Sequence, residues 1–292
     1  MSPELASALV QALVQGSLYA LIGVGFVILY RSTGVLNFAQ GSLMVLGGFS
    51  FYQLTEWGLP LVAAIPLSVV IVGLIGSGLF VAGFRRLVGE PTFVLVIATL
   101  GLSVVIETIV VLIWGPNPRP MPNLIDRNGG FEILGMRFSP LDVYCIVVCL
   151  TIILALDLML KRTRLGARMR AVADGPLLAG LNKIPVNAMS ALAWGIAAFC
   201  AAAAGISYSL RTSLDPIGLQ GFGLVAFAAV LLGGMDSIRG ALLGGMSLAI
   251  IQNLAVLWFG GDWTDVIAYT LLLLVLMVRP QGLLGSAAIR RI

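Results

Sequence analysis

The stretch KRTRLGARMRAVADGPLLAGLNKIPVNAMSALAWGIAAFCAAAAG, residues 161–205, determines how the rest of the chain is interpreted. It opens with a basic segment and closes with an apolar, alanine-rich run. The basic segment holds six of the 17 lysines and arginines of the chain: Lys161, Arg162, Arg164, Arg168, Arg170 and Lys183. A basic segment leading into an apolar run is typical of a cytoplasmic loop before a transmembrane helix.

The basic segment has helical periodicity. Leu165, Met169 and Val172 fall on one face at i, i+4 and i+7, with arginines around the remainder. Gly175-Pro176 interrupts this helix, and proline suits the first position of a second short one. The second helix presents three leucines before Pro185 ends it: Leu177, Leu178 and Leu181. We predict a two-part amphipathic helix to which a soluble partner protein can bind.

Composition defines the broad class. The chain has 292 residues, of which 59% are hydrophobic and only 10% charged, with a mean hydropathy of +1.05. A soluble domain carries roughly 25% charged residues, so an integral membrane protein is expected. The 35 glycines fit this class because small residues let transmembrane helices approach closely. The net charge of +4 is explained by its distribution across a membrane and predicts no nucleic-acid partner.

Catalytic and cofactor signatures are missing from the sequence. Histidine, the commonest general base and metal ligand, does not occur. No lysine follows a glycine, so the chain has no phosphate-binding P-loop of its own. Cys145, Cys149 and Cys200 lie in apolar runs without metal-ligand spacing. We therefore expect neither an enzyme nor a bound metal or cofactor.

Apolar runs recur along the whole chain and predict an all-α protein with about eight or nine transmembrane helices or half-helices. The full-length runs can cross a hydrocarbon core of roughly 30 Å. The apolar runs, long and short together, cover residues 5–30, 38–54, 59–84, 93–114, 141–160, 189–210, 222–232, 241–259 and 266–278.

The distribution of positive charge orients these spans. The predicted inner side holds the six basic residues of the loop with Arg31, Arg85, Arg86, Arg239, Arg279, Arg290 and Arg291. The predicted outer side holds only Arg119, Arg127, Arg137 and Arg211. This bias follows the positive-inside rule and places the N-terminus outside and the C-terminus inside. Residues 161–188 become a cytoplasmic loop and residues 115–139 a periplasmic loop, with a short hairpin around Gly135.

Three features of the spans leave alternatives open. The second run is polar and glycine-rich, which fits either tight packing with a cap at Asn37 or a discontinuous helix at a substrate path. Glu107 either serves such a path or reaches the outer interface. Gly240 with Gly244, and the alanines of residues 201–204, are candidates for an oligomer face.

Five motifs in order resemble one family. They are GVLNFAQG (34–41), ATLGLS (98–103), GARMRA with AGLN (166–171 and 179–182), LGGMDSIRG (232–240) and RPQGLL (279–284). Over nearly its whole length the chain resembles the LivH-type permease subunits of bacterial branched-chain amino acid ABC transporters. It departs from the family pattern at Asp174, Asp236 and Arg239.

The resemblance implies a single permease domain over residues 1–292 in the bacterial inner membrane, working by alternating access. The implied partners are a LivM-like second permease, two cytoplasmic ATPase subunits that bind ATP and Mg²⁺, a periplasmic substrate-binding protein and membrane lipid. The expected ATPase-coupling residues are Leu165, Gly166, Arg168, Met169, Arg170, Ala171, Asp174, Leu178 and Gly180. Arg168 and Arg170 would pair with acidic groups, and Leu165, Met169 and Leu178 would fill a groove.

Candidate residues for the translocation path are Asn37, Gln40, Thr99, Ser103, Gln252 and Asn253, although hydrogen bonding between helices explains most of them better. The spans carry few charges, which suits a branched-chain or related hydrophobic amino acid, and also urea or a short amide. The rival class is a self-sufficient secondary carrier or channel that needs Glu107 or Asp157. A membrane scaffold without a path is a further alternative, and a membrane enzyme fits least.

Overall fold

The computed structural model describes residues 2–121, 129–133, 136–279 and 281–285. Arg127, Gly135, Pro280, Arg290 and Arg291, which carried sequence expectations, lie outside these residues. Apart from one small hairpin, the regular elements of the described chain are helices, so the all-α class is confirmed.

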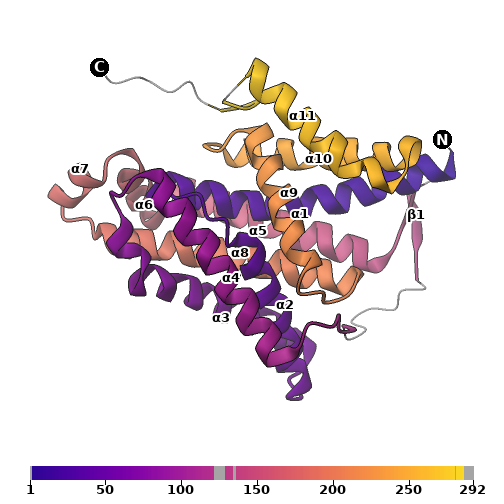
Figure 1. Ribbon diagram of the computed structural model, residues 1–292, viewed down its shortest axis with the longest axis horizontal. Coiled ribbons are helices and arrows are strands. Elements are labelled where there is room, and N and C mark those ends of the chain that lie inside the picture. Colours follow the sequence, from indigo (N-terminus) through magenta and orange to yellow (C-terminus); the bar gives the residue numbers. More distant parts are fainter. Residues whose placement is uncertain (1, 122–128, 134–135, 280, 286–292) are drawn as a thin grey trace. The chain divides into compact units, whose positions relative to one another are not determined.

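The order of elements is drawn in Figure 1. The helices are α1 Pro3–Thr33, α2 Gln40–Glu56, α3 Leu61–Ala82, η1 Phe84–Leu87, α4 Thr92–Trp114, α5 Pro140–Arg162, α6 Arg164–Asp174, α7 Pro176–Leu181, α8 Val186–Arg211, α9 Gly218–Gly233, α10 Ile238–Phe259, η2 Gly261–Trp263 and α11 Thr264–Val278. The strands are β1 Phe131–Ile133 and β2 Met136–Phe138. They pair antiparallel, with Glu132 opposite Arg137, which confirms the hairpin expected in the loop before α5.

Seven helical segments among the described residues are long and apolar enough to cross a membrane. They are α1, α3, α4, α5, α8, α10 and the segment Gly261–Val278. Helices α2 and α9 have 17 and 16 residues. At about 1.5 Å per residue each is shorter than the roughly 30 Å hydrocarbon core. The expected count of eight or nine transmembrane helices or half-helices stays a prediction.

The chain divides into two compact units. Unit 1 comprises Met1–Val27, Ile125–Leu150 and Val225–Ile292, and unit 2 comprises Ile28–Leu124 and Thr151–Leu224. Helices α1, α5 and α9 each contribute to both units. The expectation of a single permease domain over residues 1–292 stays a prediction.

Helix α8 is the centre of unit 2 and packs against α2 and α3. The contact is close because small residues face one another. A Cβ on Gly47 would lie 2.6 Å from that of Ala202, and one on Gly205 would lie 2.8 Å from the carbonyl carbon of Met44. The alanines of residues 201–204 are buried within this chain. Their suggested role in an oligomer face is therefore wrong, since this packing already covers them.

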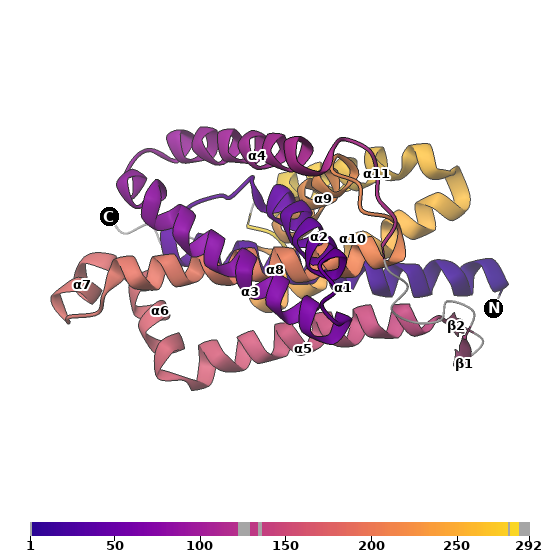
Figure 2. The same cartoon turned by 90° about the horizontal axis from the view of Figure 1, so that it is seen from below.

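One end of unit 2 carries η1 and the α6–α7 segment, which joins α5 to α8 (Figure 2). Phe84 of η1 packs on Trp194 of α8 with 4.3 Å between ring centroids. The Asn187 side chain, with its amide oxygen turned toward Arg85, accepts from Nε at 3.2 Å and Nη2 at 3.3 Å. These contacts fix the α3–α4 connection to the beginning of α8.

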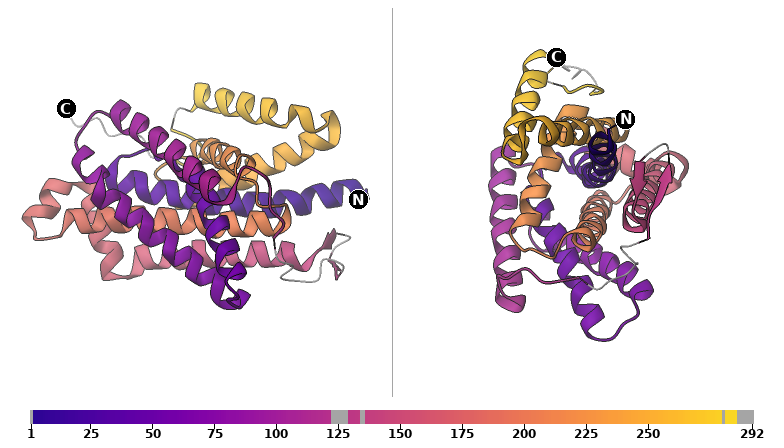
Figure 3. Two further views of the ribbon diagram at one scale, coloured as in Figure 1. Left: turned by 60° about the horizontal axis from the view of Figure 1, so that its bottom comes forward. Right: turned by 90° about the vertical axis from the view of Figure 1, so that its right-hand side faces the viewer.

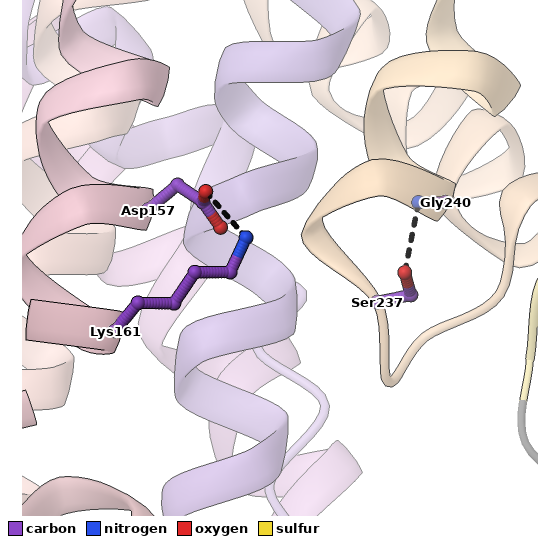
Figure 4. A network of polar contacts seen from close by, with 4 residues as sticks. All are labelled: Asp157, Lys161, Ser237 and Gly240. Atoms are coloured by element: carbon purple, nitrogen blue, oxygen red, sulfur yellow. Dashed lines mark hydrogen bonds and ion pairs between the residues drawn. The ribbon is translucent and has the colours of Figure 1, made fainter. Parts of the chain in front are cut away.

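In unit 1, α10 and α11 form a helical hairpin joined by η2 (Figure 3). Ser237 begins α10 by accepting a 3.0 Å hydrogen bond from Gly240 N (Figure 4). A Cβ on Gly240 would lie 2.6 Å from the Gly233 oxygen, and one on Gly244 would lie 2.7 Å from Gly233 N. Gly240 and Gly244 thus pack against α9 of the same chain, and their suggested role in an oligomer face is wrong.

The segment after α11 returns to the end of α9. Leu283 N donates to Leu232 O at 2.8 Å, and Leu284 N donates to Gly233 O at 2.9 Å. The last carbonyls of a helix have no partner within the helix, so these two bonds satisfy groups that would otherwise need water. The RPQGLL motif therefore has a structural role in capping α9.

Candidate functional site

The basic loop forms the two-part helix that the sequence predicted. Thr163 caps α6 by accepting a 3.1 Å hydrogen bond from Gly166 N, and α6 ends at Asp174. Gly175 is extended with φ −175° and ψ 97°, and Pro176 then occupies the first turn of α7. Before α6, Lys161 Nζ lies 2.6 Å from Asp157 Oδ2 in an i, i+4 ion pair (Figure 4).

Helix α6 presents its charges outward and its apolar residues inward. Arg164 and Arg168 are exposed, whereas Met169 and Val172 are buried. Met169 was expected to fill a groove on an ATPase, and this expectation is wrong. Its side chain is only 2% exposed and therefore packs within the chain itself.

Helix α7 is the apolar part of the loop surface. Leu177 is 78% exposed, Leu178 64% and Leu181 74%, whereas Ala179 is buried. Three neighbouring exposed leucines in a short helix outside the seven apolar segments mark a surface that contacts a protein or a membrane. We call Leu177, Leu178 and Leu181 the α7 leucine patch.

The other predicted coupling residues differ in accessibility. Arg168, Asp174 and Gly180 are exposed. Leu165, Arg170 and Ala171 are half-buried, and Gly166 is buried against the backbone of Leu160. Arg170 Nη1 is a buried donor without a hydrogen-bond partner among the described residues. The exposed members can reach a partner directly, whereas Gly166 serves the close joint between α5 and α6.

Four of the predicted path residues, Asn37, Gln40, Thr99 and Ser103, lie in unit 2, where three separate sets of hydrogen bonds hold them. Asn37 Nδ2 donates to Gln40 Oε1 at 3.3 Å, and Gln40 Nε2 donates to Ala197 O at 2.8 Å. Thr99 Oγ1 donates to Leu36 O at 3.1 Å and accepts from Phe38 N at 3.3 Å. These contacts fix the non-helical segment before α2 to α4 and α8.

Ser103 accepts a 3.0 Å hydrogen bond from Gln220 Nε2. This bond joins α4 to the beginning of α9. Gln220 was not predicted. Its signal was weak, because a single glutamine between Gly218 and Gly221, just before the apolar run at 222–232, is compatible with an ordinary loop.

The remaining two path residues, Gln252 and Asn253, lie on α10 in unit 1. Tyr19 OH donates to Gln252 Oε1 at 2.9 Å, and Gln15 Nε2 donates to the same oxygen at 3.2 Å. Asn253 Nδ2 donates to Gln15 Oε1 at 2.8 Å and to Ala249 O at 2.8 Å. Gln15 and Tyr19 were not predicted, although each is a polar side chain inside an apolar run. These side-chain hydrogen bonds join helix α1 to helix α10.

Glu107 is the acidic residue of α4. Its side chain is half-buried, and Oε1 is buried without a hydrogen-bond partner among the described residues. No cluster of three or more cysteine, aspartate and glutamate side chains suited to a metal ion occurs in the part of the chain that the structure describes. The expectation that Glu107 takes part in transport stays a prediction.

Comparison with known proteins gives the family. The model of the branched-chain amino acid transport system / permease component family matches residues 8–276. The chain is 31% identical over 298 residues to the high-affinity branched-chain amino acid transport system permease protein BraD of Pseudomonas aeruginosa, covering 97% of each.

Two relatives from Escherichia coli extend the comparison. The high-affinity branched-chain amino acid transport system permease protein LivH is 28% identical over 292 residues, covering 95% of this chain and 94% of LivH. The ribose import permease protein RbsC is 26% identical over 276 residues, covering 91% of this chain and 83% of RbsC. No solved structure matches significantly. With a family match over nearly its full length, the chain belongs to the branched-chain amino acid transport system / permease component family.

Proposed function

We propose that this chain is a membrane-spanning permease subunit of an ATP-driven ABC importer for branched-chain or related hydrophobic amino acids. The substrate follows the names of BraD and LivH, the amino-acid permeases to which the chain is 31% and 28% identical. One observation carries the coupling role, namely the α6–α7 loop with exposed arginines on α6 and the leucine patch on α7. Apolar anchors beside charged groups are the usual composition of a protein-binding surface.

The assembly that we propose contains a second, LivM-like permease, two cytoplasmic ATPase subunits and a periplasmic substrate-binding protein. ATP and Mg²⁺ bind the ATPases, and this chain binds no cofactor. The protein lies in the bacterial inner membrane with its N-terminus outside and its C-terminus inside. The concentration of lysine and arginine on the side of the α6–α7 loop supports this orientation.

In the mechanism, closure of the ATPase pair moves α6 and α7, and that motion shifts the spans between outward-open and inward-open states. A partner shifts such an equilibrium only by interacting differently with the two states. Arg168 and the α7 leucine patch are the groups through which α6 and α7 contact the ATPases. Thr163 and Gly166 transmit the displacement to α5 because they form its rigid joint with α6.

The test is co-purification of the whole assembly from detergent, followed by leucine uptake in proteoliposomes. Arg168 and Arg170 are both changed to Glu, and Arg137→Glu, an exposed arginine in β2, is the matched control. We expect the ATPases to co-purify with the wild type and with the control but not with the double variant. Retention of the ATPases by all three proteins would reject these docking residues while leaving the permease assignment intact.

A self-sufficient carrier is the second candidate. The observation that favours it is Glu107 Oε1, which is buried and has no hydrogen-bond partner in the part of the chain that the structure describes. Uptake by this chain without ATPases, abolished by Glu107→Gln, would establish that function instead. Asp157 is a weaker coupling-ion candidate because it already pairs with Lys161. Urea uptake by the complete assembly, in place of leucine uptake, would assign the alternative substrate class.

A further inference from the structure

Polar side chains form a stripe along the N-terminal part of α1. Ser7, Gln11 and Gln15 follow one another at intervals of four residues, which places them on one face of the helix. Ser7 and Gln11 are exposed, and Gln15 is half-buried. The next residue in this series, Tyr19, is 2% exposed and donates to Gln252. We call Ser7, Gln11 and Gln15 the α1 polar stripe, which leads from the surface of unit 1 to the buried contact between α1 and α10.

The stripe ends at two amides of α10 that are each bonded at one end only. Gln252 is 2% exposed and Asn253 is 8% exposed. Gln252 Oε1 accepts from Tyr19 and Gln15, and Asn253 Nδ2 donates to Gln15 Oε1. The opposite atoms, Gln252 Nε2 and Asn253 Oδ1, have no hydrogen-bond partner among the described residues. Because both amides bind the amide of Gln15, an unpaired donor and an unpaired acceptor lie close together at the end of the stripe.

Glycines already bring α1 and α10 into close contact. A Cβ on Gly16 would lie 3.0 Å from the Cα of Met246, and one on Gly245 would lie 2.8 Å from Ala20 N. Small residues of this kind let transmembrane helices approach closely. The close approach of the two helices therefore does not depend on the amides. Buried amides are usually bonded at both ends, so the two unpaired atoms call for a ligand.

The two sides of α1 differ in polarity at the same depth. Leu13 lies about 200° around the helix from Gln11 and is 36% exposed. An exposed leucine suits contact with lipid, whereas amides that faced hydrocarbon would lose their hydrogen bonds to water. Helix α1 has 31 residues and is about 46 Å long, so it extends past a hydrocarbon core of roughly 30 Å and water can reach the stripe.

We propose that the α1 polar stripe lines the outer, water-filled part of the translocation path and that the amides at its end bind the head group of the transported amino acid. Gln252 Nε2 donates to the carboxylate, and Asn253 Oδ1 accepts from the ammonium group. Residues 5–30 and 240–259 contain no charged side chain, so this neutral pair suits a zwitterion, which has no net charge. This assignment rests on the proposed function and specifies where the permease recognises its substrate.

The first experiment measures accessibility in the complete transporter in proteoliposomes. Gln11→Cys and Leu13→Cys are treated with a membrane-impermeant thiol reagent, and the wild type, with its three buried cysteines, gives the background. We expect residue 11 to react at least tenfold faster than residue 13 and its modification to reduce leucine uptake. Equal rates at the two positions would place the stripe merely at the membrane surface. That result, or no reaction at residue 11, would overturn the proposed lining of the path.

The second experiment measures leucine transported per ATP hydrolysed, with loaded binding protein. Gln252→Glu keeps an oxygen for the bonds from Gln15 and Tyr19 and replaces the unpaired donor by an oxygen that donates only when protonated. Gln53→Glu is the matched control. Gln53 Oε1 likewise accepts from an aromatic side chain, Trp114 Nε1 at 2.8 Å, and its Nε2 has no partner among the residues that the structure describes.

We expect the leucine-to-ATP ratio of Gln252→Glu to fall about tenfold at high pH, where the new carboxylate cannot donate to the substrate, and to recover at low pH. Gln53→Glu should keep the ratio of the wild type at each pH. A ratio of Gln252→Glu that is unchanged at every pH, or an equal fall in Gln53→Glu, would overturn the binding of the head group. ATPase stimulation checks that each variant assembles, and if Gln252→Glu does not, the accessibility of residues 11 and 13 decides. A wild-type complex that takes up no leucine would reject the proposed function itself.

Discussion

Nε2 of Gln40 donates a 2.8 Å hydrogen bond to the carbonyl oxygen of Ala197, although 157 residues separate them in the sequence. The same side chain accepts from Asn37 Nδ2, so Gln40 holds the buried segment before α2 against α8. This relationship explains how a stretch of irregular backbone persists inside a membrane protein, where unpaired polar groups cost several kcal/mol.

Replacing Gln40 by Leu should destabilise the permease, because Asn37 Nδ2 loses its acceptor while remaining buried. We expect a loss of about 1–3 kcal/mol in the free energy of unfolding. Thermal or denaturant unfolding of the detergent-purified protein measures it. Gln11→Leu, at an exposed glutamine of α1, should change stability by no more than about 0.5 kcal/mol. Equal effects of the two changes would contradict the role given to Gln40.

The close contact of α2 with α8 should not tolerate a side chain at Gly205. A Cβ there would meet the backbone of Met44, which cannot move without separating the helices. We expect Gly205→Val to abolish recovery of monodisperse protein in size-exclusion chromatography. Gly101→Val on α4, where a Cβ would meet nothing within 4 Å, provides the comparison and should be recovered normally. Loss of both proteins would point to a general intolerance of larger residues.

The hydrogen bonds that join Gln15, Tyr19, Gln252 and Asn253 in unit 1 can be tested by removing one hydroxyl. Tyr19→Phe removes the donor to Gln252 Oε1 and the acceptor for Gln15 Nε2. Hydrogen bonds between membrane helices contribute about 0.6 kcal/mol on average and at most about 1.7, so we expect a loss in that range. Tyr30→Phe, at an exposed tyrosine of the same helix, should leave the midpoint of thermal unfolding unchanged. The prediction fails if the two variants unfold at the same temperature.

The capping of α9 by the C-terminal segment depends on Gly282. This residue has φ +78°, and a Cβ would lie 2.6 Å from both Gly234 N and Leu231 O. Gly282→Ala should displace residues 283 and 284 and expose their amides to faster hydrogen exchange. Gly58→Ala is matched in backbone strain, with φ +83°, but a Cβ there meets open space. If both substitutions accelerate exchange at Leu283 and Leu284 equally, the close packing of Gly282 against Gly234 and Leu231 is not the reason that residue 282 is a glycine.

The α7 leucine patch and the buried face of α6 should respond differently to charge. We expect Leu178→Asp to lower ATPase co-purification at least tenfold without changing the stability of the isolated permease, since this leucine is 64% exposed. Met169→Asp should destabilise the permease itself, because a carboxylate would be buried among apolar groups. Thermal unfolding and co-purification of both variants separate the two roles. Normal ATPase binding by Leu178→Asp would remove the leucine patch from the interface.

The sequence by itself determined the membrane class, the approximate positions of the helices and the two-part helix between α5 and α8. Each of these depends on local quantities: apolar length, the distribution of lysine and arginine, and the break at Gly175-Pro176. It also selected Asn37, Gln40, Thr99 and Ser103, because polar residues are costly in an apolar span. What those residues contact could not be read from their spacing.

Only the tertiary structure decided which faces of the helices are covered. Periodicity placed Met169 beside Leu165, but packing within the chain buried Met169 and left the α7 leucines exposed. The same packing covered Gly240 and Gly244 and brought Gln15, Tyr19 and Gln220 to their partners. The physical reason is that a transmembrane helix is apolar around most of its circumference. Its rotation is therefore set by small residues and hydrogen bonds to neighbouring helices, which are distant in sequence.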